Sequence, residues 1–112
     1  MEDKLFSVKG KICIVTGGLG QIGKNFVQEL YSRGARVAVF TKHLTGERIE
    51  KTFPSAEYSR ENLRFYSVDI NRKDTIEAAL DQMLEVWPEA PDVLVNNAGI
   101  DTQPSAPPEV SG

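Results

Sequence analysis

The sequence has little cysteine or histidine and no long apolar run. Its 112 residues include one cysteine, Cys13, and one histidine, His43. One cysteine closes no intrachain disulfide, and these two residues are too few for a metal-ligand cluster. No apolar stretch approaches the roughly 18 to 20 residues that a membrane span requires, and the first residues lack the apolar core of a signal peptide. We therefore expect neither a secreted disulfide scaffold nor a membrane protein, and we expect a cytoplasmic location.

An excess of basic charge is missing as well. Lysine and arginine number 13 against 16 aspartate and glutamate residues, which gives a formal net charge of −3. This balance disfavours nucleic acid and anionic membranes as partners. With 40% hydrophobic and 26% charged residues, the composition is that of an ordinary globular protein, and the length allows at most one domain.

Four runs rich in β-branched or aromatic residues predict β-strands, at 11–16, 35–41, 63–68 and 92–96. The first, second and fourth are almost continuously apolar, which is typical of strands covered on both faces in a parallel sheet. The third is more mixed, as in an edge strand. Counted from Ile12 through Arg36 and Arg64 to Asp92, the runs recur after 24, 28 and 28 residues, so each crossover has room for one helix.

Three helices are predicted between these strands. The first should end at Gly34, where glycine can adopt a left-handed cap. Residues 44–53 predict a weaker second helix, which Pro54 ends. The third has Asn71 as its N-cap and ends before Pro88. The apolar stripe of the first helix is Ile22, Phe26, Val27 and Leu30, and that of the third is Ile76, Ala79, Leu80, Met83, Leu84 and Trp87.

This alternation predicts an α/β fold, a Rossmann-type doubly wound parallel sheet of which four strands are present. Right-handed crossovers then give the strand order 3-2-1-4. Residues 1–99 would form the βαβαβαβ core, and the proline-containing residues 100–112 a loop leading out of it. A complete fold of six such strands needs roughly 160 residues or more. We therefore interpret residues 1–112 as the N-terminal part of a dinucleotide-binding domain.

A glycine-rich turn separates the first strand from the first helix. It consists of Gly17, Gly18, Leu19, Gly20, Gln21, Ile22 and Gly23. A bound pyrophosphate needs a tight strand-to-helix turn, no Cβ between backbone and oxygens, and N–H groups at a helix N-terminus, whose dipole favours an anion. Because this turn follows an apolar strand and opens an amphipathic helix, it predicts a dinucleotide-phosphate site.

A P-loop is the competing interpretation of the same turn. Residues 18–24 also fit GxxxxGK, and Asp69 follows the third strand as a magnesium-binding Asp would. Asn25, however, stands where a P-loop requires a Ser or Thr hydroxyl for the metal. A P-loop nucleotide-binding protein is therefore the lesser alternative.

With these motifs the chain resembles the N-terminal half of a short-chain dehydrogenase/reductase. The matching motifs are IVTGGLGQIG after Gly10 and Lys11, SVDI at 67–70, and VNNAG at 95–99. VNNAG at this distance is a highly specific marker, and the motifs together span nearly the whole chain. The usual short-branch pattern is TGxxxGxG, and this chain has Gln21 where that pattern has its middle glycine. Its glycine spacing is closer to that of the extended branch. NNAG favours the shorter branch.

The resemblance implies a nicotinamide dinucleotide cofactor. In NAD-preferring relatives, an acidic residue at the end of the second strand binds the ribose hydroxyls and would repel a 2′-phosphate. Thr41 occupies that position here, and Lys42 and His43 follow it. We therefore expect NADP(H) in preference to NAD(H), with Thr41 and Lys42 at the ribose phosphate. The alternative is that Lys42 is only a solvated surface lysine.

Further site residues follow from the same resemblance. It implies that Asp69 contacts the adenine amino group and that Ile70 packs near the ring. The small residues Asn97, Ala98 and Gly99 would line the adenosine ribose, whereas Asn96 would have a structural role in the sheet. From the residues alone, an aspartate in the turn before a helix is equally natural for Asp69.

The catalytic residues implied by the family are missing from this sequence. Family members pair a tyrosine with a lysine four residues later, but the residues four positions after Tyr31, Tyr58 and Tyr66 are Ala, Asn and Ile. We interpret the chain as the cofactor-binding half of an oxidoreductase acting on a carbonyl or alcohol, with no catalytic or metal-binding residue of its own. A substrate would bind only to a longer form, and the family implies a homo-oligomer. The alternative is a non-catalytic nucleotide-binding or interaction module complete at 112 residues.

Overall fold

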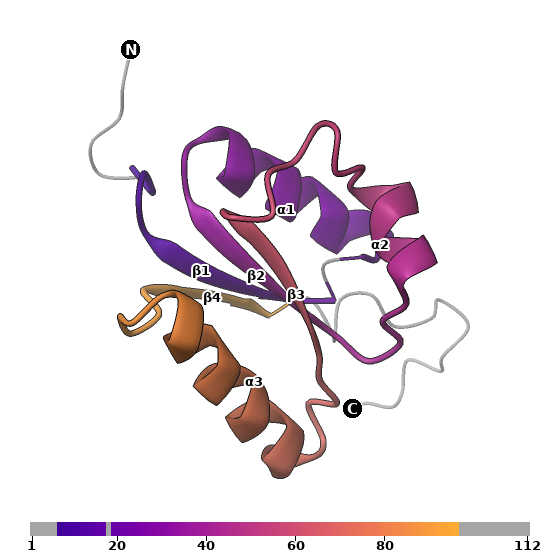
Figure 1. The fold of residues 1–112 in the computed structure, drawn as a ribbon, viewed down its shortest axis with the longest axis vertical. Coiled ribbons are helices and arrows are strands. Elements are labelled where there is room, and N and C mark those ends of the chain that lie inside the picture. Colours follow the sequence, from indigo (N-terminus) through magenta and orange to yellow (C-terminus); the bar gives the residue numbers. More distant parts are fainter. Residues whose placement is uncertain (1–6, 18, 97–112) are drawn as a thin grey trace, which may run out of the picture.

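The computed structural model describes residues 7–17 and 19–96 of the chain (Figure 1). Strands and helices alternate along these residues, and each strand lies close to its predicted run. The elements are β1 (Ile12–Thr16), α1 (Gln21–Ser32), β2 (Arg36–Thr41), α2 (Gly46–Thr52), β3 (Leu63–Ser67), α3 (Lys73–Val86) and β4 (Val93–Asn96). The interpretation of residues 97–112 as the end of the core and a loop falls outside the described residues.

The strands form one parallel sheet in the order β3-β2-β1-β4, which confirms the predicted order. Thr16 at the end of β1 is in register with Phe40 on β2 and with Asn96 on β4. The carboxyl ends of these strands therefore reach the same edge of the sheet. Within the described residues β3 pairs with β2 alone, so its mixed sequence is that of an edge strand, as predicted.

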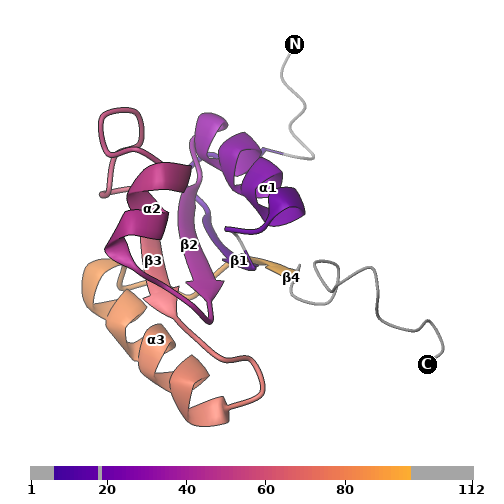
Figure 2. The same ribbon diagram turned by 90° about the vertical axis from the view of Figure 1, so that its right-hand side faces the viewer.

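Helices cover both faces of the sheet. Figure 2 shows α1 and α2 on one face and α3 on the other. On β1, Cys13 and Val15 pack in the cluster that includes residues of α1, and Ile12 and Ile14 pack in the cluster that includes residues of α3. Two-sided burial is the reason that β1 is continuously apolar. No helix among the described residues is long and apolar enough to cross a membrane.

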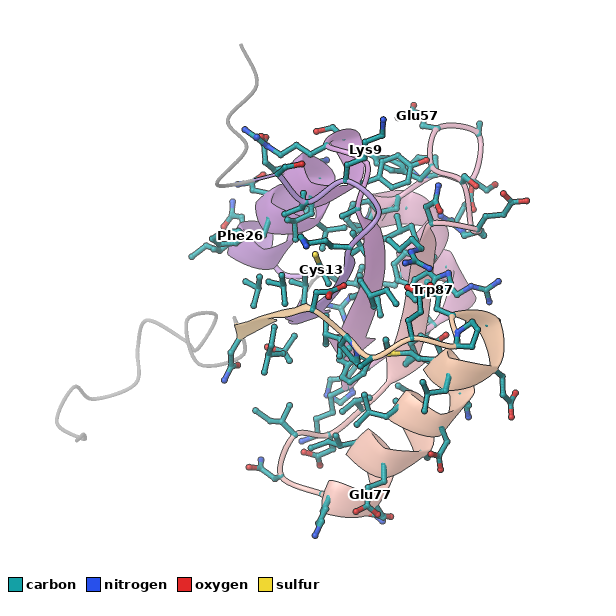
Figure 3. The ribbon with its side chains drawn as sticks, turned by 90° about the vertical axis from the view of Figure 1, so that its left-hand side faces the viewer. Lys9, Cys13, Phe26, Glu57, Glu77 and Trp87 are labelled. Carbon is teal, nitrogen blue, oxygen red and sulfur yellow. The ribbon has the colours of Figure 1, made fainter. Side chains whose placement is uncertain are left out.

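The apolar stripe of α1 is only partly buried. Val27 is fully buried and Gly23 is buried, but Ile22 and Phe26 are 41% and 43% exposed. Figure 3 shows Phe26 projecting away from the sheet. Only part of the predicted apolar stripe is therefore buried, because α1 meets the described sheet along the line of Gly23 and Val27.

The start of α3 differs from the prediction as well. Its N-cap is Arg72, and the prediction of Asn71 was wrong. The Asn71 N–H donates to Asp69 Oδ1 at 3.0 Å, and the Arg72 N–H donates to the Asp69 carbonyl at 2.8 Å. These two bonds hold the chain in a turn that continues past Asn71, so the helix begins one residue later.

The other two helix ends follow local rules. Gly34 has φ of +90° directly after the C-cap of α1, which confirms the predicted left-handed glycine. The second helix is shorter than expected, because Thr45 caps it. Thr45 Oγ1 accepts a hydrogen bond from the Arg48 N–H at 3.1 Å, which satisfies a backbone donor of the first turn.

Cys13 gives a test of this core. Its side chain is fully buried, and Figure 3 places it between the helical layers. Burial, with a smaller contribution from Asp92, raises the pKa of the thiol above its ordinary value of 9.0. The folded state therefore retains the thiol proton at pH values where the unfolded chain has released it. The stability contributed by this group is complete below pH 9 and is lost as pH rises through the folded-state pKa.

We expect Cys13→Ala to lower the free energy of unfolding by about 1 to 2 kcal/mol at pH 7. We also expect the variant to lose less stability than the parent chain when the pH rises above 9, in urea titrations at a series of pH values. A chromogenic disulfide reagent should modify Cys13 only as fast as the chain unfolds. Rapid, complete modification of the folded protein would contradict this burial.

Candidate cofactor site at the carboxyl edge of the sheet

The glycine turn continues directly from β1. The Gly17 N–H donates to the Phe40 carbonyl at 2.8 Å, so the pairing with β2 extends one residue past the strand. Gly17 then takes φ of +66°, a left-handed conformation that glycine adopts without the steric cost of a Cβ. The Gly20 N–H donates back to the Gly17 carbonyl at 3.0 Å. This bond closes the turn and places α1 at the end of β1.

The N-terminus of α1 has no anionic side chain of its own. Gly20 is the N-cap, with no side-chain capping bond and no acidic residue in the first turn of the described helix. The first turns of α2 and α3 contain Glu47 and Asp74 respectively. The backbone donors of the first turn of α1 precede the Lys24 N–H, which bonds to the Gly20 carbonyl at 2.8 Å. The positive end of the helix dipole is therefore available to an external anion.

The side chains of this turn have different surroundings. Leu19 is 8% exposed and packs into the core on the α1 face, so only its backbone is suited to contact a ligand. Gln21 is exposed, Ile22 is 41% exposed, and Gly23 is buried. Gly18 lies outside the described residues. The turn thus combines a core anchor at Leu19 with an open helix end.

The end of β2 provides a cation beside this turn. Thr41 is only 8% exposed, whereas the Lys42 side chain is 60% exposed. The loop that follows is held by Arg48, whose Nη1 donates to the His43 carbonyl at 2.8 Å. Arg48 was not among the residues predicted for this site. The capping signal of Thr45 three residues earlier could have placed Arg48 in the first turn of α2, next to this loop.

The end of β3 holds Asp69 in a fixed position. Asp69 Oδ1 accepts the Asn71 N–H at 3.0 Å, and the Asp69 N–H donates to Thr75 Oγ1 at 3.0 Å. Ile70 beside it is 45% exposed. Lys42 Nζ lies 3.9 Å from Asp69 Oδ2, so the structure brings together two residues that the sequence assigned to different parts of one ligand. The role of Thr75 was also missed, because its partner lies outside its own helix.

The ends of β1 and β4 are joined by side chains. Thr16 Oγ1 donates to Asn96 Oδ1 at 2.9 Å. Asn96 therefore has the structural role in the sheet that was expected of it. The residues that follow Asn96 in that motif, Asn97, Ala98 and Gly99, lie outside the described residues.

The remaining titratable side chains of the described residues do not form a cluster of metal-ligating groups. Within them no group of three or more His, Cys, Asp or Glu residues is placed to hold a metal ion. Tyr66 is buried at 9% exposure and packs edge-on against Phe40, with ring centroids 6.0 Å apart. Burial raises the pKa of Tyr66 above its ordinary value of 10.0. Tyr66 is thus a residue of the core cluster that includes Phe40.

Comparison with known proteins agrees with this architecture. A family model of short chain dehydrogenases matches residues 11–111. Sorbitol-6-phosphate 2-dehydrogenase of Klebsiella pneumoniae is 34% identical over 94 residues, which are 84% of this chain and 32% of that protein.

Solved structures give the same result. A short chain dehydrogenase from Bacillus anthracis matches with a TM-score of 0.71 at 28% identity, over 82% of this chain and 36% of that one. One from Leptospira borgpetersenii, solved with bound NAD+, matches with a TM-score of 0.63 at 26% identity, over 86% of this chain and 34% of that one. The chain thus spans about a third of the length of these relatives. On the family match, the fold and the motifs together, this chain belongs to the short chain dehydrogenase family.

Proposed function

We propose that this chain forms the adenosine-diphosphate half of an NADP(H) site in an oxidoreductase that acts on a carbonyl or alcohol. One observation carries the proposal. The Gly17 turn opens a helix N-terminus without an acidic first turn, at the sheet edge where Lys42 and Asp69 also lie. This combination supports a dinucleotide-phosphate site, because the backbone donors of a helix N-terminus and a cation at the same sheet edge both favour anionic oxygens.

Each part of the ligand has a counterpart in the chain. The backbone of Gly17, Gly18, Leu19, Gly20, Gln21, Ile22 and Gly23 would hold the pyrophosphate. Thr41, which is 8% exposed, and Lys42, whose side chain is 60% exposed, would hold the ribose 2′-phosphate. Asp69 and Ile70 would contact adenine, and Asn97, Ala98 and Gly99 the ribose. When bound, the nicotinamide group supplies the hydride chemistry.

The proposed preference for NADP(H) over NAD(H) rests on the charges that follow β2. An acidic residue after β2 would repel a 2′-phosphate, and this chain has Thr41 and Lys42 there instead. The NAD+ in the Leptospira structure describes that protein. The preference proposed here is supported by the identity of Thr41 and the 60% exposure of the Lys42 side chain.

Catalysis needs residues other than these 112. No tyrosine of the chain has a lysine four positions later, and an unassisted tyrosine with a pKa near 10 is a poor acid-base catalyst at neutral pH. We propose that a longer form supplies the catalytic tyrosine and lysine and binds the substrate in the cytoplasm. A complete non-catalytic module would instead bind the cofactor without turnover in every natural form.

The helix N-terminus can be tested with Gln21→Glu. We expect a negative charge at the first residue of α1 to stabilise the helix by about 0.3 to 1 kcal/mol. The same charge should repel the pyrophosphate. Fluorescence titrations of the chain should therefore show that NADPH and NADH each bind roughly five-fold more weakly. Gln82→Glu, on an exposed part of α3, adds the same charge and should leave both affinities unchanged. Unchanged affinities in both variants would contradict the pyrophosphate assignment.

Lys42 can be tested by comparing two cofactors. We expect Lys42→Ala to lower the affinity for NADPH roughly five-fold and to leave the affinity for NADH nearly unchanged, because only NADPH has the 2′-phosphate. Lys73→Ala is the matched control, because it removes an 88% exposed lysine from α3. An equal loss for both cofactors would show that Lys42 does not contact the phosphate.

We also propose that the chain self-associates through β4. Among the described residues β4 pairs only with β1, and Leu94 on it is 65% exposed. An open strand edge with an exposed apolar side chain favours association with a second copy. Sedimentation velocity should show oligomers that Leu94→Lys disperses, while Leu84→Lys, on α3, leaves them assembled. A well-folded monomer at all concentrations would contradict this proposal.

A further inference from the structure

A lysine and an aspartate meet where β2 and β3 end. Lys42 Nζ is 3.9 Å from Asp69 Oδ2, and the two side chains are 60% and 23% exposed. The two side chains differ in conformational freedom as well as in charge. Lys42 is a long, largely solvated side chain directly after β2, whereas Asp69 is short and half-buried. The cation can therefore move relative to the carboxylate.

Several hydrogen bonds hold Asp69 and its turn in place. Its Oδ1 accepts the Asn71 N–H at 3.0 Å, and its own N–H donates to Thr75 Oγ1 at 3.0 Å. The Arg72 N–H donates to its carbonyl at 2.8 Å, and the Val68 N–H donates to the Thr41 carbonyl at 2.8 Å. The last bond ties the β3 end to the β2 end. The negative charge of Asp69 is thus a fixed feature of the edge.

Nearby cations on the described elements have other partners. Arg72 Nη2 lies 2.9 Å from Asp74 Oδ2, and Arg48 Nη1 donates to the His43 carbonyl at 2.8 Å. Lys42 is the cation that the described structure pairs with Asp69. A 2′-phosphate bound by Lys42 would therefore lie close to a fixed carboxylate of its own charge sign.

On the basis of the proposed function, we propose that Asp69 determines the degree of preference for NADP(H) by competing with the 2′-phosphate for Lys42. A ligand without the 2′-phosphate leaves the Lys42–Asp69 pair intact. A ligand with it must draw the ammonium group away from Asp69, or share it, and is repelled by the carboxylate. Contact of Asp69 with adenine affects both ligands alike and cancels in their affinity ratio. Asp69 is in this respect a specificity-determining residue that acts through Lys42.

The test measures the affinities of ADP-ribose and 2′-phospho-ADP-ribose by calorimetry on the full chain. The parent is compared with Asp69→Asn, Lys42→Ala and the double variant. We expect Asp69→Asn to weaken the binding of both ligands. The affinity for 2′-phospho-ADP-ribose divided by that for ADP-ribose should nevertheless rise about two- to five-fold, which is the range expected for an exposed ion pair. With Lys42→Ala present, Asp69→Asn should raise this ratio clearly less, because the competition has gone.

Two further variants make the result specific. The side chain of Asp74, on α3, is 68% exposed and paired with Arg72. Asp74→Asn removes this nearby charge and should leave the affinity ratio unchanged. Asp69→Asn keeps a side-chain oxygen that can accept the Asn71 N–H. If Asp69→Asn does not fold, Asp69→Ser retains an acceptor for this turn and takes its place.

Each outcome has one meaning. A ratio that stays constant or falls with Asp69→Asn, or that rises equally with and without Lys42, overturns the competition. If Lys42→Ala lowers the ratio in the same experiment, the proposed phosphate contact survives and only this inference fails. If the parent chain binds neither ligand, the proposed cofactor site itself fails.

Discussion

The position of β1 between β2 and β4 is the constraint on which the rest of the structure depends. It is paired on both sides and covered on both faces. Because all its neighbours are parallel, their carboxyl ends gather at one edge. The bond from the Gly17 N–H to the Phe40 carbonyl extends this pairing into the glycine turn. The place where α1 begins is therefore set by the sheet, and the candidate phosphate site follows from it.

The helix ends and charged side chains at this edge of the sheet differ in how they are complemented. The N-terminus of α1 has neither an acidic first turn nor a side-chain cap among its described residues. Thr45 and Glu47 at α2, in contrast, complement their helix end internally. The N-terminus of α1 therefore has no internal negative charge to complement it, and at the end of β2 the exposed Lys42 is paired with Asp69.

Much of this could be predicted from local sequence. Apolar runs gave the strands because burial on both faces leaves no alternation to maintain. Gly34 was predictable because a left-handed residue after a helix is usually glycine. Asn71 was wrong as an N-cap, because Asp69 accepts its N–H and continues the turn. Arg48 and Thr75 were missed because their partners, the His43 carbonyl and the Asp69 backbone, lie outside their helices.

The sequence by itself determined the succession of strands and helices, the glycine turn and the missing tyrosine-lysine pair, since each depends on neighbours within a few residues. The three-dimensional fold decided which residues meet. Lys42 and Asp69 are brought to 3.9 Å by the pairing of β2 with β3. Packing likewise buried Val27 and left Phe26 exposed on the same helix. Such contacts depend on the register of strands and the rotation of a helix on the sheet, which local propensities do not specify.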